Sequence, residues 1–419
     1  MPPLGLSEAR ARMIDEVLRA RRRPTSERVS LAAAAGRFLA VDVRADRDQP
    51  PFRRSTRDGF AVHAADLAAA SAATPVALRV RGEIPAGTVW PYAVARGDAV
   101  EIMTGAPVPD GADSVVMVEE TSRAGEDVLV KRRTAPGENI VDRGSELRAQ
   151  AIACSAGTRL DPGALALIAS LGCAAPEVAV RPRVAIIGTG DELVPVDATP
   201  SVAQIRDSNR HCLAALVEAA GGKAITMPIV RDDRAATTAA LAEAAANADL
   251  VLVSGGVSMG KHDHVEPALA DLSARVIFDG VAIRPGRPLV FGVFSRAPTP
   301  VPFFGLPGNP LSALVTFALF ARAAIELLSG ADAAPLPIFA AKLARPFALP
   351  RPLPLTVFTP ARFERDPALA SGLVAPFVAP VVSQGSGDLA ALGRADGFLV
   401  VPPGSPPLAV DSWVSVLPK

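Results

Sequence analysis

The spacing of apolar residues divides the chain into segments of different texture. Apolar positions recur at helical intervals over residues 6–22, which predicts a surface helix. A second helix is predicted over 25–40, although Gly36 inside it lowers its helical propensity. From 52 to 141 the pattern changes to short β-like runs separated by Gly and Pro turns, which is typical of a small β-rich domain. The runs are 76–80, 99–103, 114–119 and 128–131.

The segment 181–330 alternates buried strands with helices. Such alternation predicts a doubly wound, mostly parallel sheet. The predicted strands are 184–187, 224–229, 250–253 and 288–293, and the predicted helices are 208–220, 233–246 and 310–328. Before this segment, Asp161 as N-cap and Pro162 at the first helical position predict a helix over 161–171.

The remaining tail is rich in proline and holds the apolar runs 397–401 and 413–417. The fold class predicted is therefore α/β and multidomain. A central doubly wound, mostly parallel α/β domain is joined by two small β-rich domains and an elongated helical or linker part. The predicted domains are 1–51 with 142–180 (helical or linker), 52–141 (inserted β-rich), 181–330 (α/β) and 331–419 (C-terminal β).

Charge and composition narrow the class of partner. The 419 residues contain 43 Lys plus Arg and 43 Asp plus Glu, so no overall field steers the chain to nucleic acid or to an anionic membrane. No uninterrupted apolar run reaches the roughly 18 residues of a membrane span. The three cysteines have no CxxC spacing, which disfavours a disulfide framework or a structural zinc site. The Arg-rich start has no apolar signal region, and we expect a cytoplasmic protein.

Four loops of the α/β segment carry the chemistry. Ligands of open α/β sheets bind beyond the carboxyl ends of the strands. Glycines there let backbone N–H groups approach an anion, and a helix N-terminus adds partial positive charge. Any one of these loops alone would be an ordinary turn, but four on one predicted edge favour a phosphate site. The loops are 188–193, 254–260, 284–288 and 305–310.

Charged side chains in or near these loops suggest how an anion and a cation are held. Arg284 and Arg287 can add charge-assisted hydrogen bonds to an anion. The acids Glu192, Asp207, Asp232 and Asp263 favour a bridging divalent cation, since Mg²⁺ takes one or two carboxylates plus substrate oxygens. Walker A and GxGxxG spacings are absent, which disfavours an ordinary P-loop ATPase or a dinucleotide dehydrogenase.

The ordered motifs of the chain resemble a known family. Its α/β segment is similar to the molybdopterin-binding domain shared by the molybdopterin molybdenumtransferases, the gephyrin E region and smaller adenylyltransferases. The upstream β-rich segment resembles the extra domain of the molybdenumtransferase branch. The matching motifs are 188–193, 207–210, 231–233, 254–258, 284–286 and 305–310 in the first segment, and 82–87, 103–107 and 111–116 in the second.

The resemblance implies an enzyme that inserts molybdate into adenylylated molybdopterin, with Mg²⁺-dependent release of AMP. It implies a homodimer whose active site lies between the α/β domain of one subunit and the small β-domain of the other. Molybdopterin adenylyltransferase and recipient molybdoenzymes are the further partners it suggests. By motif match the catalytic candidates are Asp58, Thr104, Glu192 and Asp232, and the metal candidates are Asp232, Asp263 and Glu192. The substrate-binding candidates are Gly188, Thr189, Gly190, Ser254, Gly255, Gly256, Ser258, Arg284, Arg287, Pro307, Gly308, Asn309 and Ser386.

Several positions depart from the family pattern. Arg57 stands where a methionine is usual, and Arg284 and Arg287 replace two lysines. Gly280 and Leu355 stand where the family has a lysine and an arginine. Arginine keeps the positive charge but replaces a point charge by a planar fork. These departures are compatible with a branch that serves one class of molybdoenzyme.

Two other functions remain open at this point. A non-catalytic scaffold of the gephyrin kind would not need the acids Asp58, Glu192, Asp232 and Asp263, which argues against it. An adenylyltransferase that uses ATP would not need the extra domain at 52–141. The molybdenumtransferase reading is therefore the favoured hypothesis.

Overall fold

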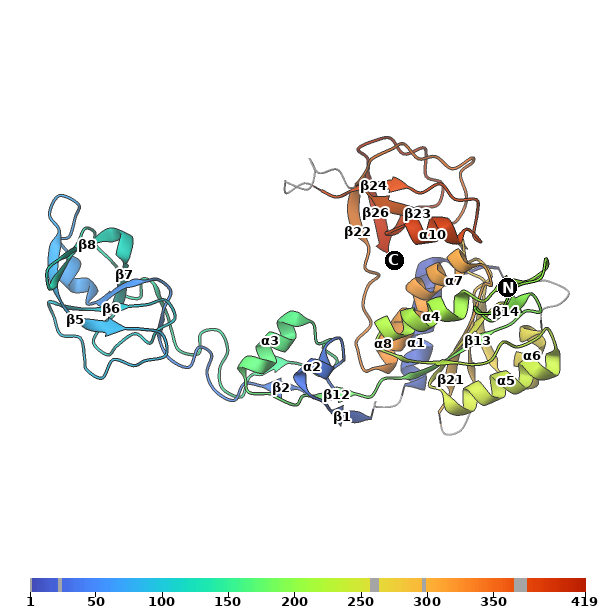
Figure 1. The fold of residues 1–419 in the computed structure, drawn as a ribbon, viewed down its shortest axis with the longest axis horizontal. Helices are drawn as coiled ribbons and strands as arrows, with labels where there is room; N and C mark the ends of the chain where they lie inside the picture. The colour runs from blue at the N-terminus through green and yellow to red at the C-terminus, as the bar shows by residue number, and fades with distance from the viewer. Residues whose placement is uncertain (1, 22–24, 257–263, 296–298, 365–374) are drawn as a thin grey trace. The chain divides into compact units, whose positions relative to one another are not determined.

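The computed structural model describes residues 2–21, 25–256, 264–295, 299–364 and 375–419. The chain forms two compact units (Figure 1). The first comprises 1–41, 156–160 and 177–419, and the second comprises 42–155 and 161–176. Each is described by itself below.

A six-stranded sheet forms the centre of the first unit. Its order is β16-β13-β17-β21-β20-β18. The first four strands are mutually parallel, whereas β20 runs antiparallel to β21 and β18 antiparallel to β20. The mostly parallel sheet expected from the alternating pattern is thus confirmed. The bounds are β16 Lys223–Thr226, β13 Arg183–Gly188, β17 Leu250–Ser254, β21 Val301–Leu306, β20 Val290–Phe294 and β18 Arg275–Asp279.

Helices cover both faces of this sheet, as the doubly wound prediction requires. Strand β13 shows the alternation: Val184 and Ile186 pack into one buried cluster, whereas Ala185 and Ile187 pack into the other. The first cluster includes side chains of α1, α4, α7, η3 and α8, and the second includes those of α5 and α6. The bounds are α1 Leu6–Ala20, α4 Asn209–Ala219, α7 Pro310–Thr316, η3 Phe317–Ala321, α8 Arg322–Leu328, α5 Arg234–Asn247 and α6 Val265–Asp271.

The segment Pro310–Leu328 is one continuous helical stretch with a π-helical turn at Phe317–Ala321. By length and composition it could cross a membrane, although it has no uninterrupted apolar run of that length. It is 72% buried inside the first unit, where Val315, Phe320 and Ile325 are fully enclosed. Its apolar character is therefore that of a core helix, and the other described helices do not meet the same criterion.

The prediction of one helix over 25–40 is wrong. The segment forms β1 Ser26–Arg28 and the short helix α2 Leu31–Ala34. Gly36 adopts a left-handed φ of 72°, which ends the helix, and Phe38 and Leu39 then form β-bridges. Strand β1 pairs with β12, Glu177–Ala179. Tertiary pairing has overridden local helical propensity here.

The C-terminal strands of the first unit close into a small barrel, consistent with the predicted β-domain. Pairings run β23-β24-β22-β26-β25, and β25 pairs back with β23. Strand β19 adds to the edge through β23. The bounds are β19 Ile283–Arg284, β22 Phe339–Leu343, β23 Thr356–Phe363, β24 Phe377–Pro380, α10 Leu389–Arg394, β25 Gly397–Val401 and β26 Trp413–Pro418.

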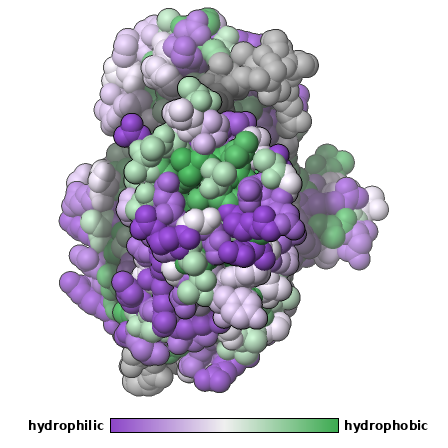
Figure 2. Space-filling view, turned by 90° about the vertical axis from the view of Figure 1, so that its left-hand side faces the viewer, coloured by the Kyte–Doolittle hydropathy of each residue, from purple (hydrophilic) through white to green (hydrophobic). Residues whose placement is uncertain are grey.

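The second unit is built on another six-stranded sheet, in the order β7-β4-β6-β5-β9-β8. Apolar side chains form a buried cluster on each of its faces. The end of this unit seen in Figure 2 is largely hydrophilic around one apolar area. The bounds are β4 Gly59–Val62, η1 Ala64–Leu67, β5 Val76–Ile84, β6 Asp98–Ile102, β7 Ser114–Met117, η2 Val118–Glu120, β8 Thr121–Ala124 and β9 Asp127–Val130. Outside this sheet lie β2 Val43–Arg44, β3 Arg54–Ser55, β10 Ile140–Val141, β11 Ile152–Cys154 and α3 Pro162–Ser170.

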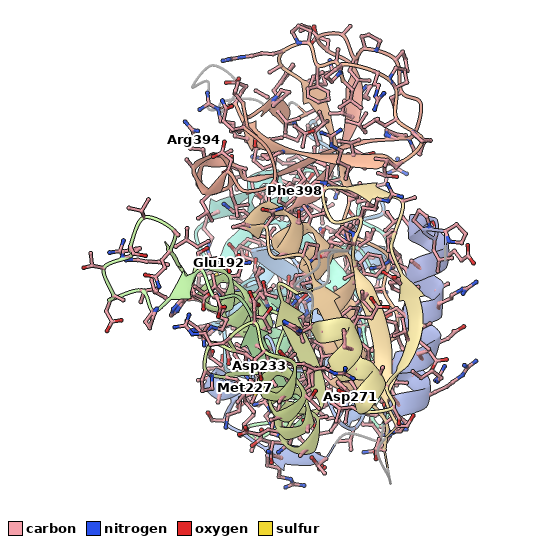
Figure 3. All side chains as sticks on the ribbon, turned by 90° about the vertical axis from the view of Figure 1, so that its right-hand side faces the viewer. Glu192, Met227, Asp233, Asp271, Arg394 and Phe398 are labelled. Atoms are coloured by element: carbon pink, nitrogen blue, oxygen red, sulfur yellow. The ribbon has the colours of Figure 1, made fainter. Side chains whose placement is uncertain are left out.

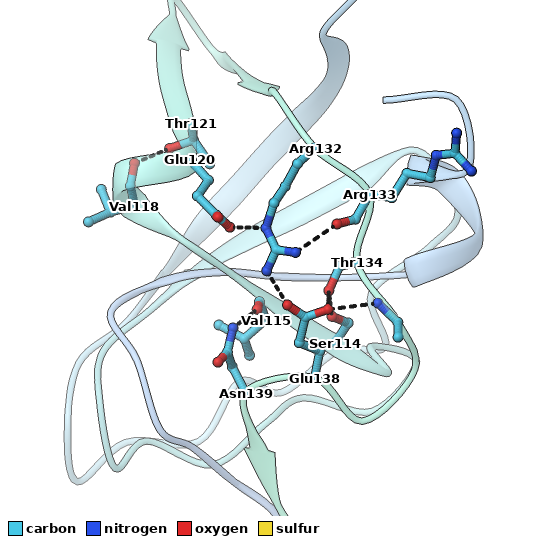
Figure 4. Close-up of polar contacts among 11 residues, drawn as sticks. Ser114, Val115, Val118, Glu120, Thr121, Arg132, Arg133, Thr134, Glu138 and Asn139 are labelled. Carbon is cyan, nitrogen blue, oxygen red and sulfur yellow. Dashed lines mark hydrogen bonds and ion pairs between the residues drawn. The ribbon is translucent and has the colours of Figure 1, made fainter. Parts of the chain in front are cut away.

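A polar cluster fixes the loop that leaves β9 (Figure 4). Arg132 donates to both Glu120 and Glu138. Glu138 also accepts from the hydroxyl of Thr134 at 2.9 Å and from the backbone N–H of Ala135 at 2.9 Å. This network ties the loop to the end of the sheet.

Candidate active site

A cavity of about 960 Å³ opens at the carboxyl edge of the central sheet. Loops that follow β13, β17 and β21 form its walls, as the sequence predicts. Because β20 is antiparallel, its first residue Val290 pairs with Gly305 at this same edge, and Pro288 therefore reaches the cavity too. Predicted residues that line it are Gly188, Thr189, Gly190, Glu192, Asp232, Ser254, Gly255, Gly256, Pro307, Gly308 and Asn309.

Two glycines shape the cavity loops, and one of them, Gly255, lies where two loops touch. Gly255 has a φ of 96°, and a Cβ there would lie 2.8 Å from the backbone oxygen of Thr189. Gly190 has a φ of 145°, and a Cβ there would lie 2.4 Å from the carboxylate of Glu192. Any larger residue at either position would strain the backbone, because both φ angles are positive, and at Gly255 it would also clash with backbone. The β13 and β17 loops are thus held against each other at the cavity.

The hydroxyl of Thr189 lacks a partner. Thr189 is only 7% exposed and lines the cavity. Its Oγ1 atom is buried and makes no hydrogen bond within the part of the chain that the structure describes. Because an unsatisfied buried hydroxyl is costly, this atom indicates a place for a polar ligand.

Asn209 ties two of the cavity loops together. Its Nδ2 group donates to Ser254 Oγ at 2.9 Å and to the backbone oxygen of Gly308 at 2.7 Å. A carbonyl can only accept, so the contact with Gly308 fixes which end of the amide is nitrogen. Both amide hydrogens are used, which leaves Oδ1 as an acceptor on a residue that lines the cavity.

A buried ion pair between Asp207 and Arg210 holds Asn209 in position. Asp207 is 2% exposed and accepts from the guanidinium of Arg210, which also donates to the backbone oxygen of Met227. A Cβ on Gly188 would lie 3.1 Å from Arg210, so the arginine packs directly against the β13 loop. The pair fixes the start of α4, and with it Asn209.

Ser208 and Asn209 line the cavity but were not among the predicted binding residues, and Asp207, expected as an acid near a cation, is paired with Arg210 instead. Their motif, followed by Arg210, was recognised in the sequence. They follow the short strand β15 (Ile205–Arg206), which pairs with β14 (Leu193–Val194) outside the central sheet. The sequence analysis looked for ligand-binding loops only at the carboxyl ends of the central-sheet strands, and this segment follows a strand of another sheet.

Besides the ion-paired Asp207, the carboxylates of Glu192 and Asp232 line the cavity. Glu192 lies on the side of the central sheet nearer the C-terminal barrel (Figure 3). Asp232 is oriented by Asp191: each backbone N–H donates to the other side chain at 3.3 Å. Two acids fit Mg²⁺, which completes its shell with substrate oxygens and water. The described residues hold no group of three or more His, Cys, Asp or Glu suited to a metal, and Asp263 and Ser258 lie outside those residues.

The predicted arginines lie away from the cavity lining. Arg284 is exposed and belongs to β19, which pairs with β23 of the barrel. Neither Arg284 nor Arg287 lines the cavity or forms an ion pair within the described residues. The arginine that does line it is Arg206, whose Nε donates to the backbone oxygen of Ala198 at 3.0 Å.

The loop before α10 brings the C-terminal barrel to the cavity. The backbone oxygen of Ser386 accepts from the N–H of Leu311 at 3.0 Å, near the start of α7. Gly387 and Leu389 then line the cavity. Ser386 itself does not line it, so its predicted role in binding stays a prediction.

Asp58 and Thr104 belong to the second unit, where the fold brings them into contact. Asp58 Oδ1 accepts from the backbone N–H of Thr104 at 2.6 Å and from its hydroxyl at 2.8 Å. These two hydrogen bonds, the backbone one first, hold the pKa of Asp58 below its usual value. The carboxylate is thus ionised and oriented.

Models of three protein-family regions match successive parts of the chain. Residues 4–172 match the MoeA N-terminal region (domain I and II). Residues 185–327 match the probable molybdopterin binding domain, and 342–419 match the MoeA C-terminal region (domain IV). The cavity described above lies within the last two regions.

Curated proteins and a crystal structure of the same family are also similar to this chain. Molybdopterin molybdenumtransferase from Nostoc sp. is 40% identical over 75% of this chain and 72% of its own length. The Bacillus subtilis protein of the same name is 34% identical over 96% of this chain and 91% of its own. The molybdopterin biosynthesis MoeA protein from Pyrococcus horikoshii OT3 has a TM-score of 0.78 and 28% identity, with both chains fully covered. The chain therefore belongs to the MoeA family of molybdopterin molybdenumtransferases.

Proposed function

We propose that this protein inserts molybdate into adenylylated molybdopterin and releases AMP. The observation that carries the proposal is the buried hydroxyl of Thr189, which has no partner among the described residues, inside a glycine-lined cavity at the carboxyl edge of the sheet. Sheets of this kind bind phosphate-bearing ligands at that edge. The names of the curated relatives support transfer of molybdenum to molybdopterin, and the adenylylated substrate and the release of AMP are proposed from the family resemblance.

The residues of the cavity divide the work of binding. Thr189 donates its hydroxyl proton to a phosphate oxygen, and the glycine loops allow that oxygen to approach the backbone. Asn209 Oδ1 accepts from an N–H or O–H group of the ligand, since its own hydrogens are used. This combination selects a ligand that carries both phosphate oxygens and hydrogen-bond donors.

Glu192 and Asp232 are the groups that would hold Mg²⁺ in this proposal. When bound, the ion neutralises charge on the pyrophosphate oxygens. The reciprocal hydrogen bonds with Asp191 hold the Asp232 side chain in one orientation, so it would not have to become ordered each time the ion binds. Asp263 remains a proposed third ligand from the sequence.

We further propose a homodimer, as the family resemblance implies, and the cytoplasmic location expected from the sequence is likewise a proposal. In this arrangement Asp58 and Thr104 of one subunit contribute to the cavity of the other. Their mutual hydrogen bonds support the proposal because they present an oriented, ionised carboxylate. Arg284, Arg287, Ser258 and Ser386 remain proposed substrate contacts, and molybdopterin adenylyltransferase and recipient molybdoenzymes remain proposed partners.

One assay separates the three candidate functions. The protein is incubated with adenylylated molybdopterin, Mg²⁺ and molybdate, and AMP is measured; a parallel reaction contains free molybdopterin and ATP. AMP release in the first reaction supports molybdenum transfer. ATP consumption in the second supports adenylylation instead. Absence of both reactions supports a scaffold and contradicts the proposal.

A further inference from the structure

The C-terminal barrel carries a second cavity, of about 360 Å³, that shares no lining residue with the first. Three arginines line it, and each comes from a different element. Arg345 follows β22, and Arg362 lies near the end of β23. Arg394, labelled in Figure 3, is the last residue of α10. The barrel closure brings these distant positions to one hollow.

The charge of this cavity is not balanced by its own residues. Among the lining residues that the structure describes, Asp388 is the single acid, so three arginines and one aspartate give these residues a net charge of +2. The Asp388 carboxylate is already used, since it accepts from the backbone N–H groups of Ala391 at 2.9 Å and Gln384 at 3.0 Å. It caps α10 and forms no ion pair within 4.0 Å with a described arginine, although the pKa of Asp388 is lowered by the backbone N–H of Gln384 and, to a smaller extent, by the charge of Arg394.

One acid outside the lining reduces the excess of positive charge, at one of the three arginines only. Arg345 lies 3.5 Å from Glu364, which does not line the cavity. Arg362 and Arg394 have no carboxylate within 4.0 Å among the residues that the structure describes. Within the described residues the guanidinium of Arg394 makes one hydrogen bond, to the backbone oxygen of Ala390 at 3.1 Å. Most of the guanidinium N–H donors at this cavity are therefore available to a ligand.

Clustered guanidinium groups repel one another, and the repulsion is relieved when an anion binds between them. The planar fork of arginine matches the oxygen spacing of phosphate-like anions and makes paired charge-assisted hydrogen bonds. The chain as a whole has equal numbers of basic and acidic residues, so this local excess is not a consequence of a basic surface. We propose that Arg345, Arg362 and Arg394 form a binding site for a small tetrahedral oxyanion.

Isothermal titration of the full-length protein tests the site, with inorganic phosphate, sulfate and molybdate as probes and chloride at matched ionic strength as the reference. We expect saturable binding of at least one oxyanion. Arg362→Gln and Arg394→Gln should each weaken it about ten- to a hundred-fold, the effect of losing a charge-assisted hydrogen bond. A preference for molybdate identifies the co-substrate of the proposed reaction as the natural ligand, whereas a preference for phosphate identifies a phosphorylated metabolite.

Arg351→Gln is the matched control, because Arg351 is an exposed arginine of the same barrel that does not line the cavity. This variant should bind like the wild type. Circular dichroism shows whether each variant is folded, and Arg362→Lys keeps the charge if Arg362→Gln is unstable. The site is wrong if the wild type binds none of the three oxyanions more than chloride, or if the Arg362→Gln/Arg394→Gln double variant binds them unchanged. Neither result bears on AMP release at the first cavity.

Discussion

At the scale of single residues, the buried hydroxyl of Thr189 lowers the stability of the folded protein, and a hydrogen bond to a ligand would offset this loss. A buried hydroxyl without a partner destabilises the folded state by about 1–3 kcal/mol. Thr189→Val keeps the branched shape and removes the hydroxyl. We expect the free energy of unfolding to stay equal or to rise by up to about 1 kcal/mol, while the Kd for adenylylated molybdopterin rises roughly ten-fold.

Urea unfolding and equilibrium binding measure the two effects. Thr237→Val is the matched control, because Thr237 is buried but its hydroxyl already donates to the backbone oxygen of Asp233 at 2.8 Å. That variant should lose stability. A Thr189→Val protein that is clearly less stable, with unchanged substrate affinity, would show that the hydroxyl serves the fold and not a ligand.

The pair Asp58 and Thr104 gives a pH dependence. Hydrogen bonds to the ionised form lower the pKa of Asp58, so removing one raises it. Thr104→Val removes the hydroxyl and leaves the backbone N–H, so Asp58 is protonated at higher pH than in the wild type. If the carboxylate is needed for turnover, the acidic limb of the kcat/KM profile shifts to higher pH. Thr104→Ser keeps the hydroxyl and should restore the wild-type limb; an unshifted limb in Thr104→Val rules out this role for Asp58.

At the scale of elements, the carboxylate of Glu138 holds the loop after β9 in its conformation. The backbone N–H of Ala135 is the main cause of the lowered pKa of Glu138, and Arg132 and Thr134 lower it further. A carboxylate whose pKa is depressed by folding stabilises the protein above its unfolded-state pKa, and this contribution is lost as the pH falls through the folded-state value. The relevant window therefore lies below about pH 4.

Glu138→Gln tests this element. At neutral pH we expect a loss of about 1 kcal/mol, the size of a partly exposed ion pair. Below pH 4 the difference from the wild type should shrink, since the wild type loses the same interaction. Thermal unfolding across this range is the measurement, with Glu119→Gln at an exposed glutamate as control. A difference in stability between Glu138→Gln and the wild type that stays constant with pH would contradict the stabilising role of the ionised carboxylate.

The elements that sequence patterns predicted well are those whose signal is local. Buried strands such as β13 and β17 are continuous apolar runs, and the glycine loops that follow them were predicted as the site. The segment 25–40 failed because its strand and bridges depend on residues about 120–150 positions away, such as Arg159 and Val178. The closure of the barrel through β23 and β25 is also a long-range pairing that no local pattern encodes.

In the candidate site, too, residues with a local sequence signal were predicted, whereas those that depend on long-range contacts were not. Gly188, Gly190 and Gly255 were found because their loops follow strands of the main sheet. The role of Asn209 was missed because it depends on where Ser254 and Gly308 lie in space. Contact between Asp58 and Thr104 was likewise not encoded by spacing, although the family motifs named both residues.

At the scale of the whole molecule, the proposed active site needs two copies of the chain. We expect sedimentation equilibrium to show a stable dimer at micromolar concentration. Mixing an Asp58→Ala subunit with an Asp232→Ala subunit should restore part of the AMP release, since one of the two shared sites in the mixed dimer keeps both acids. A fully active monomer, or a mixture no more active than its components, contradicts the shared site.

The most direct test of the central claim is molybdate-dependent, single-turnover release of AMP from adenylylated molybdopterin at limiting Mg²⁺. The account predicts about one AMP per cavity when molybdate is present and little without it, because cleavage is coupled to metal insertion. Asp232→Asn keeps the side-chain shape but removes the charge proposed to hold Mg²⁺, and it should slow release at least ten-fold, the effect of losing roughly 1.4 kcal/mol of transition-state stabilisation. AMP released at the same rate without molybdate, or by Asp232→Asn as fast as by the wild type, would contradict the account.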